Sequence, residues 1–466
     1  MDVTAELEAF LEGHRFAWLG RAALECVSLA RHICVDLLIC TRYGLDDEWV
    51  AARIGAELIS VERETGQRLL GPGREELLQG PFGPRILAAL QEHPRCLVTS
   101  RSSETLEAWV TAGQGRLRVL AVPTRIKQPL DDKVALRRIL PALGIEPPPH
   151  VIINLKAVDF QQLERRYGLP FVLQLAEGAG GSGTFLVSSA SELRALQDER
   201  GEQEVSISRY IAGLSPNITA VVLDHAVLTA YPAVQLVGVP QCTSLAFRYC
   251  GNDFFAVRRL PAAARQSIFD QAERIGSWLR TRGFRGMFGI DLVFDGQRVY
   301  PTEVNPRFPA SWPMTIELQR MSAQVPLILA HVVGHMEGGQ ALLERLVPRW
   351  GQPQPVDGAQ MRLYNRDNDW RVVTGSLRPG VYSWDGHRAT FLRQGLTIAD
   401  CRADDEFVLT GSVARADTRV EAGAHLCWIQ TRRGVLADAS NKLQPWAAAL
   451  CDWLYDALSL SECGAP

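Results

Sequence analysis

Residues 286–307 read GMFGIDLVFDGQRVYPTEVNPR, and this stretch decides the fold. Two short apolar runs flank an Asp-Gly pair, which is typical of a β-hairpin turn. Glu303, Asn305 and Arg307 follow one another at a spacing of two residues, so an extended chain points all three side chains to one face. A carboxylate, an amide and a guanidinium suit Mg²⁺ together with a phosphate group, because oxygen atoms hold the metal and the arginine fork binds the anion. The alternative is a hairpin with a solvated polar face.

Asp291 lies in the first strand of this hairpin. A regular hairpin with a two-residue turn would place Asp291 opposite Tyr300, and it would leave Asp291 and Glu303 on opposite faces because side chains alternate along each strand. One metal ion needs both carboxylates on the same face. We therefore predict that Gln297 belongs to the turn, or that one strand carries a bulge.

Composition narrows the class of protein. The chain has 466 residues, 47% of them hydrophobic, which is enough for two or three domains. A net charge of −3 without a basic run argues against nucleic acid as a partner. The acidic, amphipathic N-terminus is unlike a signal peptide and no apolar run is long enough to cross a membrane, so we expect a cytoplasmic protein. Ten cysteines without a C-x-x-C pair predict reduced, buried thiols in place of disulfides or zinc.

The first 124 residues alternate strand-like apolar runs with amphipathic stretches, and this pattern predicts an α/β layer with a parallel sheet. The strand-like runs are 16–19, 35–40, 57–61, 96–99 and 117–122. Further along, amphipathic helices are expected at 265–282 and 318–335. A Pro/Gly-rich linker at 349–357 then leads into short strands and a terminal helix.

A glycine-rich loop lies within residues 169–189, which read LPFVLQLAEGAGGSGTFLVSS. The loop joins two strand-like runs, so it is the tip of a hairpin, whereas a Walker loop would end in Lys-Ser/Thr and open a helix. Its glycines let backbone N–H groups converge on an anion. Such a tip is equally often a plain mobile turn, so its meaning depends on the segments around it. The glycines are Gly178, Gly180, Gly181 and Gly183.

Taken in order, these segments resemble the ATP-grasp superfamily over residues ~130–335. Lys133 opens a helix, the glycine-rich hairpin follows, a hinge strand occupies 206–213, and a strand with an acid then pairs with Glu-x-Asn-Pro-Arg. The resemblance implies an α/β N-terminal layer, an α+β ATP-grasp domain and a small β-rich C-terminal domain. The expected boundaries are 1–124 for a Rossmann-like domain before the ATP-grasp domain, 125–340 for the ATP-grasp domain with its lid at approximately 150–212, and 355–466 for the α+β C-terminal domain.

The resemblance implies an ATP-dependent carboxylate–amine ligase that uses ATP with Mg²⁺, or with Mn²⁺ in its place. Such an enzyme activates a carboxylate as an acyl phosphate and joins it to an amine, which releases ADP and phosphate. The last hundred residues are similar to those of bacterial peptide ligases from natural-product pathways, the pheganomycin-ligase type. The substrates implied are a small carboxylate, an amino acid or a peptide, and an amine; a homodimer is also expected.

The resemblance also assigns roles to residues of this chain. The implied ATP-binding positions are Lys133, Gln174, Gly178, Gly180, Gly181, Ser182, Gly183, Arg209, Tyr210 and Ile211. The implied metal ligands are Asp291, Glu303 and Asn305, and Arg307 would bind the transferred phosphoryl group. Arg248 lies in a polar loop, where it is a candidate to bind the substrate carboxylate; the alternative is a loop held by its own turn hydrogen bonds.

One position departs from the family pattern. The strand before the glycine loop normally carries a lysine, where this chain has Gln174. The loss of one charge-assisted contact weakens nucleotide binding by ~1–2 kcal/mol. Either the site works with one lysine, for which an arginine elsewhere could compensate, or the domain has lost catalysis. The retained Asp291, Glu303, Asn305 and Arg307 favour a working site. Two alternatives stay open: a bicarbonate-activating enzyme like biotin carboxylase, and an ATP-binding regulatory or assembly protein with a degenerate site.

Overall fold

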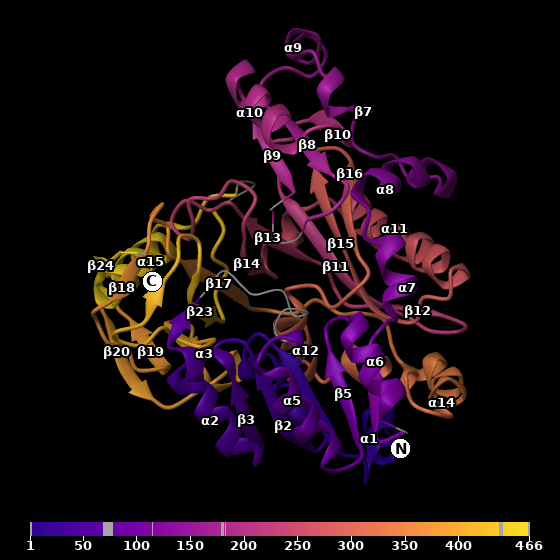
Figure 1. Cartoon of the computed structure of the whole chain (residues 1–466), viewed down its shortest axis with the longest axis vertical. Coiled ribbons are helices and arrows are strands. Elements are labelled where there is room, and N and C mark those ends of the chain that lie inside the picture. Colours follow the sequence, from indigo (N-terminus) through magenta and orange to yellow (C-terminus); the bar gives the residue numbers. More distant parts are fainter. Residues whose placement is uncertain are drawn as a thin grey trace.

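The computed structural model of the chain (Figure 1) describes residues 2–68, 78–113, 115–178, 181, 183–437 and 441–464. Its N-terminal part contains a parallel sheet of strand order β3-β2-β1-β5-β6, which confirms the predicted α/β layer. The strands are β1 (Phe16–Gly20), β2 (Val35–Cys40), β3 (Glu57–Ser60), β5 (Arg95–Thr99) and β6 (Leu117–Leu120).

Helices cover both faces of this sheet because its strands are apolar on both sides. Leu19, Ile39 and Leu97 pack under α5 and α6, whereas Trp18 and Leu38 belong to the core that contains α1 and α13. The helices of this part are α1 (Val3–Leu11), α2 (Leu45–Ile54), α3 (Val61–Thr65), α5 (Gly83–Gln91), α6 (Glu104–Ala112) and α7 (Thr124–Lys127).

A small antiparallel sheet projects at the top of Figure 1. Its order is β7-β10-β8-β9, and α9 (Phe160–Tyr167) and α10 (Ala190–Arg200) pack against it. Its strands are β7 (His150–Asn154), β8 (Phe171–Leu175), β9 (Thr184–Val187) and β10 (Glu204–Arg209). The glycine-rich segment joins β8 to β9, so it is the tip of a hairpin as predicted. We call this sheet and its helices the lid.

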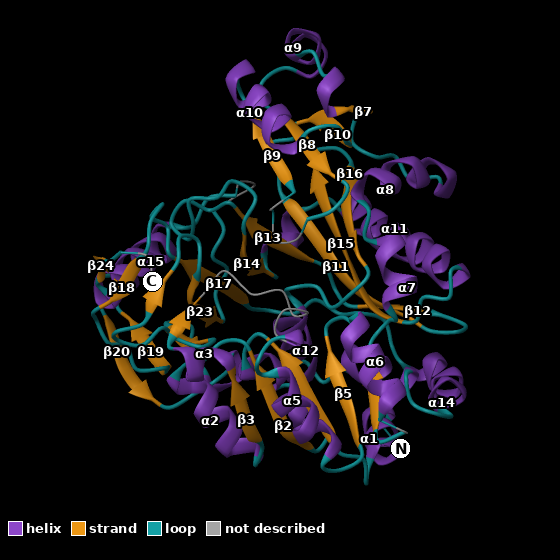
Figure 2. Ribbon diagram, in the orientation of Figure 1, coloured by secondary structure: helices purple, strands orange, loops and turns teal. Residues whose placement is uncertain are grey.

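The main sheet runs through the middle of the molecule in the order β16-β15-β11-β13-β14-β17-β23-β21-β19-β20 (Figure 2). The strand β17 pairs with β14, so the C-terminal residues extend the same sheet that carries the hairpin. The strands are β11 (Ser215–Val222), β13 (Ala233–Val237), β14 (Tyr249–Asp253), β15 (Gly286–Phe294), β16 (Val299–Asn305), β17 (Ala359–Tyr364), β19 (Gly380–Trp384), β20 (Ala389–Arg393), β21 (Glu406–Thr410) and β23 (His425–Thr431); β12 (Val227–Thr229) pairs with β11.

Two further helices cover this sheet: α11 (Ala262–Thr281), as predicted, and α15 (Pro445–Leu458). A short sheet joins β18 (Arg371–Val373), β22 (Arg419–Val420) and β24 (Leu460–Glu462) to β4 (Gln67–Arg68).

Among the described residues, no helix is both long and apolar enough to cross a membrane. All ten cysteines are free thiols and most are buried, as predicted.

The single helix predicted at 318–335 is wrong. The chain forms α12 (Trp312–Met321) and α13 (Leu327–Gly334), and a break separates them; α14 (Gly339–Leu346) follows. Pro326 has no N–H to donate and precedes the first turn of α13, and Ala323 adopts a φ of 54° in the break. The apolar periodicity continues across the break because both helices bury the same kind of side chain.

The hairpin that carries the two acids has both of the predicted features. The turn spans residues 295–298, so Gln297 belongs to it, and its backbone N–H donates to Asp295 Oδ1 at 2.8 Å. A four-residue turn alone would still set Asp291 opposite Thr302. Instead Thr302 is the extra residue of a bulge, and Asp291 pairs directly with Glu303. The bulge therefore puts both carboxylates on one face of the sheet.

The N-terminal sheet is fastened to the C-terminal part through Asp46, at the start of α2. This side chain is fully buried, and its oxygens accept hydrogen bonds from the backbone N–H groups of Ser412 at 2.8 Å and Val413 at 3.0 Å. Backbone donors that are buried without a partner are costly, so these bonds hold the two parts in one arrangement.

Replacing Asp46 with alanine should therefore destabilise the whole chain. The substitution leaves two buried N–H groups without these acceptors, and we expect the free energy of unfolding to fall by about 3 kcal/mol. Asp46→Asn keeps one acceptor oxygen and should lose less. Thermal unfolding of the three proteins tests the order; equal midpoints for wild type and Asp46→Ala would contradict this role for Asp46.

Candidate active site

Asp291 and Glu303 lie side by side on the face of the main sheet opposite to α11. Their neighbours Ile290 and Leu292 point the other way, into the core that α11 covers. Asp291 accepts hydrogen bonds from Gln235 Nε2 at 2.5 Å and from Asn305 Nδ2 at 3.0 Å. The predicted trio of Asp291, Glu303 and Asn305 is thus gathered in one place.

Burial raises the pKa of both carboxyl groups. The pKa of Glu303 reaches about 7, because burial and the charge of Asp291 outweigh the opposing effects of Lys133 and Arg307. The pKa of Asp291 is also raised, by burial above all, although Arg307 and Asn305 oppose the rise. Two half-buried acids facing each other across a strand pair repel each other, so the pair needs positive charge nearby.

The donor set fits Mg²⁺ or Mn²⁺. Two carboxylates and the amide oxygen of Asn305, once its amide turns to present oxygen, would supply hard oxygen ligands. Within the described residues, no group of three or more His, Cys, Asp or Glu side chains could hold a metal by itself. This is the partial set expected when water and phosphate oxygens complete the coordination of Mg²⁺.

Lys133 connects these acids to the lid. It is the first residue of α8 (Lys133–Ile139), whose start is fixed by Asp132, because Asp132 Oδ1 accepts hydrogen bonds from two backbone N–H groups of the first turn. The Lys133 side chain is buried, with Nζ 3.4 Å from Glu303 Oε1, and it donates to the Gly178 carbonyl at 2.6 Å. One ammonium group therefore touches both the acid pair and the glycine-rich loop.

Arg137, which the sequence analysis missed, occupies the neighbourhood of Gln174. Its guanidinium donates from Nη2 to Gln174 Oε1 at 2.7 Å and from Nη1 to the Pro301 carbonyl at 2.6 Å. Arg137 is fully buried, and burial lowers its pKa to about 10, while the charge of Glu303 raises it. Its position could have been predicted from the sequence, because Arg137 lies four residues after Lys133 and residues i and i+4 share a helix face.

The remaining ATP-binding candidates line the base and tip of the lid. Arg209 ends β10, and Tyr210 and Ile211 form the connection from β10 to β11. Gly181 adopts a φ of 93°, and a side chain there would meet the Phe247 carbonyl at 2.5 Å, so the lid tip lies against the loop before β14. Gly183 also belongs to the tip. Gly180 and Ser182 lie outside the described residues.

The two predicted catalytic arginines occupy different surroundings. Arg307 follows β16 in a tight turn, with its N–H donating to the Asn305 carbonyl at 2.7 Å, so it is not part of the extended strand that the spacing suggested. Its charge still lowers the pKa values of Asp291 and Glu303. Arg248 stacks 4.7 Å from the ring centre of Tyr364 and donates to the Gly423 carbonyl at 3.1 Å.

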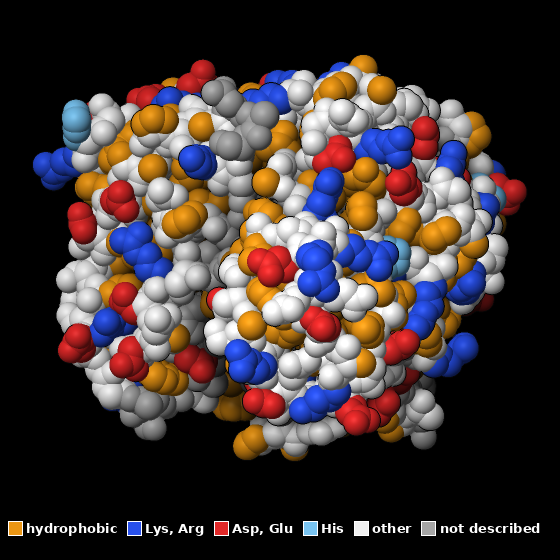
Figure 3. Space-filling model, turned by 90° about the horizontal axis from the view of Figure 1, so that it is seen from above, with side chains coloured by type: hydrophobic (Ala, Val, Ile, Leu, Met, Phe, Trp, Pro, Cys, Tyr) orange, Lys and Arg blue, Asp and Glu red, His pale blue; other side chains and the backbone are white. Residues whose placement is uncertain are grey.

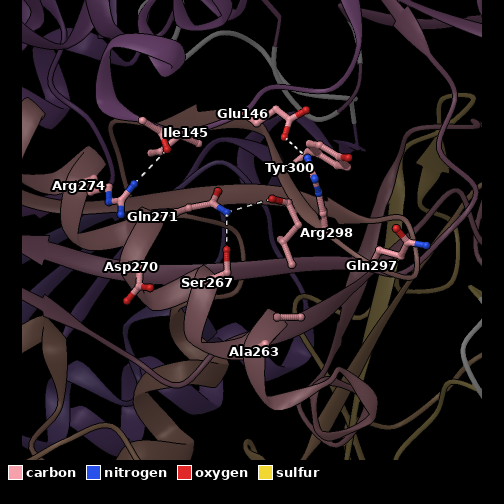
Figure 4. A pocket seen from close by; sticks show the side chains of 13 residues that line it. Ile145, Glu146, Ala263, Ser267, Asp270, Gln271, Arg274, Gln297, Arg298 and Tyr300 are labelled. Carbon is pink, nitrogen blue, oxygen red and sulfur yellow. Dashed lines mark hydrogen bonds and ion pairs between the residues drawn. The ribbon is translucent and has the colours of Figure 1, made fainter.

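A pocket of about 310 Å³ between α11 and the β15–β16 turn is separate from this site (Figure 4). Gln271 Nε2 there donates to Ser267 Oγ and to the Val299 carbonyl, both at 3.0 Å. Val299 belongs to the core face of the hairpin, whereas Asp291 and Glu303 lie on the opposite face. Seen from above, the molecule is hollowed by a groove, and charges of both signs are scattered over the visible surface (Figure 3).

Comparisons with known proteins identify a domain in the middle of the chain. Residues 130–311 match the ATP-grasp domain. The formate-dependent phosphoribosylglycinamide formyltransferase of Xanthomonas campestris pv. campestris (strain B100) is 24% identical over 406 residues, which cover 80% of this chain and 90% of that protein.

Solved structures show the same fold. The biotin carboxylase domain of Hydrogenobacter thermophilus 2-oxoglutarate carboxylase, solved as a dimer with Mg·ADP and bicarbonate, has a TM-score of 0.55 at 11% identity and covers 96% of this chain and 90% of its own. Phosphoribosylamine–glycine ligase from Thermotoga maritima has a TM-score of 0.55 at 12% identity, covering 90% and 92%. Residues 130–311 therefore match an ATP-grasp domain, and the chain as a whole shares its fold with that biotin carboxylase domain and that glycine ligase.

Proposed function

We propose that this site binds ATP with Mg²⁺ between the lid and the main sheet, and that it activates a small carboxylate for attack by an amine. The observation that carries the proposal is the bulge at Thr302, which sets Asp291 beside Glu303 and next to Lys133. Phosphoryl transfer depends on positioning and on neutralising charge, and this arrangement offers both.

Each residue has a place in that chemistry. Asp291, Glu303 and Asn305 would hold Mg²⁺, which neutralises charge on the phosphates when bound. Lys133 would bind a phosphate of ATP, since its ammonium already lies between the acids and the loop at Gly178. The substrate carboxylate attacks the γ-phosphorus to give an acyl phosphate and ADP. The amine then attacks the acyl carbon, and phosphate leaves as the amide forms.

Arg137 supports a working site over a degenerate one. A lysine at position 174 would bring one positive charge to the strand before the glycine loop. Arg137 brings one to the same point from α8, because its guanidinium bonds to the Gln174 side chain at 2.7 Å. The charge that the strand lacks is therefore supplied by the helix, and Gln174 is held in place by it.

The proposal extends to the identity of the carboxylic acid that is activated. The similarity of the C-terminal residues to peptide ligases suggests an amino acid or a peptide. The curated relative carries formate and phosphoribosylglycinamide in its name, which suggests a small acid and an amine on a phosphorylated sugar. A bicarbonate-activating enzyme is the second candidate, since a biotin carboxylase domain shares the fold. Measuring ADP release with carboxylates, amines and bicarbonate added in turn separates the two candidates.

Glu303→Gln should abolish nearly all ADP release while the fold is kept. The substitution removes one charge from the proposed metal site, and it also removes a half-buried carboxyl group whose pKa is raised, so the thermal midpoint should change little. Glu146→Gln is the matched control and should leave activity unchanged, because Glu146 is exposed and pairs with Arg298 of the turn, away from the acid pair. If Glu303→Gln released ADP at the rate of the wild type, the assignment of Glu303 to the metal site would be wrong.

Gln174→Lys should weaken ATP binding. The new ammonium would lie against the guanidinium of Arg137, and two buried like charges repel strongly. We expect the Kd for Mg·ATP to rise roughly tenfold or more. The double variant Arg137→Gln/Gln174→Lys moves the charge back to the strand and should recover most of the affinity. Tighter binding by the single variant would show that Arg137 does not serve this position.

The affinity for Mg·ATP should fall at low pH. Metal binding requires ionised Glu303, whose pKa of about 7 leaves it mostly protonated at pH 6 and mostly ionised at pH 8. We expect roughly tenfold weaker binding at pH 6 than at pH 8, with proton release measured calorimetrically in buffers of different ionisation enthalpy. The same titration of Glu303→Gln corrects for the nucleotide's own protonation. A pH dependence equal in both proteins would contradict this account.

A further inference from the structure

Asp291, one of the proposed metal ligands, is held by an amide from a strand that is not its neighbour. Gln235 Nε2 donates to Asp291 Oδ1 at 2.5 Å. Gln235 lies in β13 and Asp291 in β15, and β11 separates these two strands in the main sheet (Figure 1). Because neighbouring strands are about 4.8 Å apart, the two side chains together bridge about 10 Å between their strands.

The register of the sheet directs Gln235 towards Asp291. Residues that pair directly across two strands share a face, and so do residues two apart along one strand. Gln235 pairs with Ser215 of β11, and Asp291 pairs with Asn217 of the same strand. All four side chains therefore lie on the face of the acid pair. The short side chain of Ser215 leaves Gln235 room to extend across β11.

Asn217, the direct cross-strand neighbour of Asp291, is engaged elsewhere. Its Nδ2 donates to Ser311 Oγ at 3.1 Å, and its Oδ1 accepts from Asn252 Nδ2 at 2.9 Å. Asn217 and Asn252 are both buried, so these bonds lie away from water and fix the orientation of the Asn217 amide. The nearest amide in register is thus bonded to other groups, and Asp291 takes its hydrogen bond from Gln235.

The two carboxylate oxygens of Asp291 have different partners. Gln235 occupies Oδ1, whereas Asn305 Nδ2 donates to Oδ2 at 3.0 Å. Once the Asn305 amide turns to present its oxygen to a metal ion, its N–H leaves Oδ2, and the Gln235 bond to Oδ1 remains. One oxygen of Asp291 is then free for a metal ion, and the other stays tied to β13.

We propose that Gln235 is a positioning residue, whose hydrogen bond to Oδ1 makes Asp291 a ligand through one oxygen and so favours Mg²⁺ or Mn²⁺ over Ca²⁺. Mg²⁺ requires near-octahedral geometry, whereas Ca²⁺ accepts about six to eight oxygens and takes both oxygens of a carboxylate. A donor that occupies one carboxylate oxygen therefore discriminates between these ions. This inference rests on the proposed function, since it concerns the choice of metal at the same site.

The test measures metal binding and needs no turnover. The full chain is saturated with a nonhydrolysable ATP analogue, Mn²⁺ is added, and free Mn²⁺ is followed by electron paramagnetic resonance. A parallel titration of the analogue without protein is subtracted. Competition with Mg²⁺ and with Ca²⁺ then gives the relative affinities. Gln235→Leu removes the donor at similar volume, and the fold should be kept because Gln235 is only half-buried.

Gln235→Leu should bind Mn²⁺ and Mg²⁺ roughly tenfold more weakly than the wild type, because removing a group that orients a metal ligand lowers metal affinity by about that factor or more. Its affinity for Ca²⁺ should change little, since both oxygens of Asp291 are then available. The preference for Mg²⁺ over Ca²⁺ should therefore fall about tenfold. Gln235→His keeps an N–H near the end of the side chain and should restore most of this preference.

Gln266→Leu is the matched control. Gln266 also donates its side-chain amide to an aspartate, with Nε2 2.9 Å from Asp270 Oδ1, but both residues are exposed on α11, away from the acid pair. This variant should bind all three ions as the wild type does. If Gln235→Leu fails to fold, Gln235→Asn takes its place, because its shorter side chain does not reach Asp291 and the same results are expected.

Two results would overturn the role of Gln235. One is unchanged binding of all three ions by Gln235→Leu. The other is an equal loss of affinity for Ca²⁺ and Mg²⁺, which a purely structural role would produce. Glu303→Gln distinguishes these results from a failure of the proposed function: if it binds Mn²⁺ as the wild type does, the metal site is wrong and Gln235 has no ligand to position. If Glu303→Gln loses Mn²⁺ and Gln235→Leu does not, the metal site stands and only the role of Gln235 is wrong.

Discussion

The direct pairing of Asp291 with Glu303 is the constraint on which the site depends. One extra residue, Thr302, rotates Glu303 onto the face that Asp291 occupies, and the Thr302 hydroxyl fixes the bulge by donating to the Asp291 carbonyl at 3.0 Å. Two half-buried acids so close together repel each other and are stabilised by positive charge around them. Lys133 and Arg307 meet that demand from α8 and from the turn after β16, and the lid is tied to the same point through the Gly178 carbonyl.

The need for positive charge near the acids also explains how the site can have glutamine at position 174. Phosphoryl transfer needs a positive charge near the acids and the glycine-rich loop. The position of that charge matters more than which residue carries it. In this chain α8 carries two cations one turn apart, so Lys133 reaches Glu303 while Arg137 reaches Gln174 and the Pro301 carbonyl. Because Arg137 also bonds to β16, the helix and the hairpin are positioned together.

Local patterns in the sequence were enough to predict the parallel sheet, the hairpin and its irregular register, because these depend on apolar alternation and on turn residues. Contacts between distant segments were not predictable. The pairing of β14 with β17 extends one sheet across the chain, and the Arg21 and Arg362 side chains act on each other although they lie far apart in sequence. Arg137 lies between these cases, since helical spacing placed it near Lys133 but only the fold brings it to Gln174.

The attachment of the N-terminal sheet and the position of Arg362 are connected through Trp428. Asp46 binds the backbone of the loop that follows β21, and Gly411 of that loop lies so close to Trp428 that a side chain there would come within 2.5 Å of the indole. The same indole stacks on Arg362. The contact that holds α2 against this loop therefore also helps to fix the ring on which Arg362 stacks. Buried contacts of this kind join the N-terminal part to the C-terminal part, so the stability of the junction and the position of Arg362 depend on the same residues.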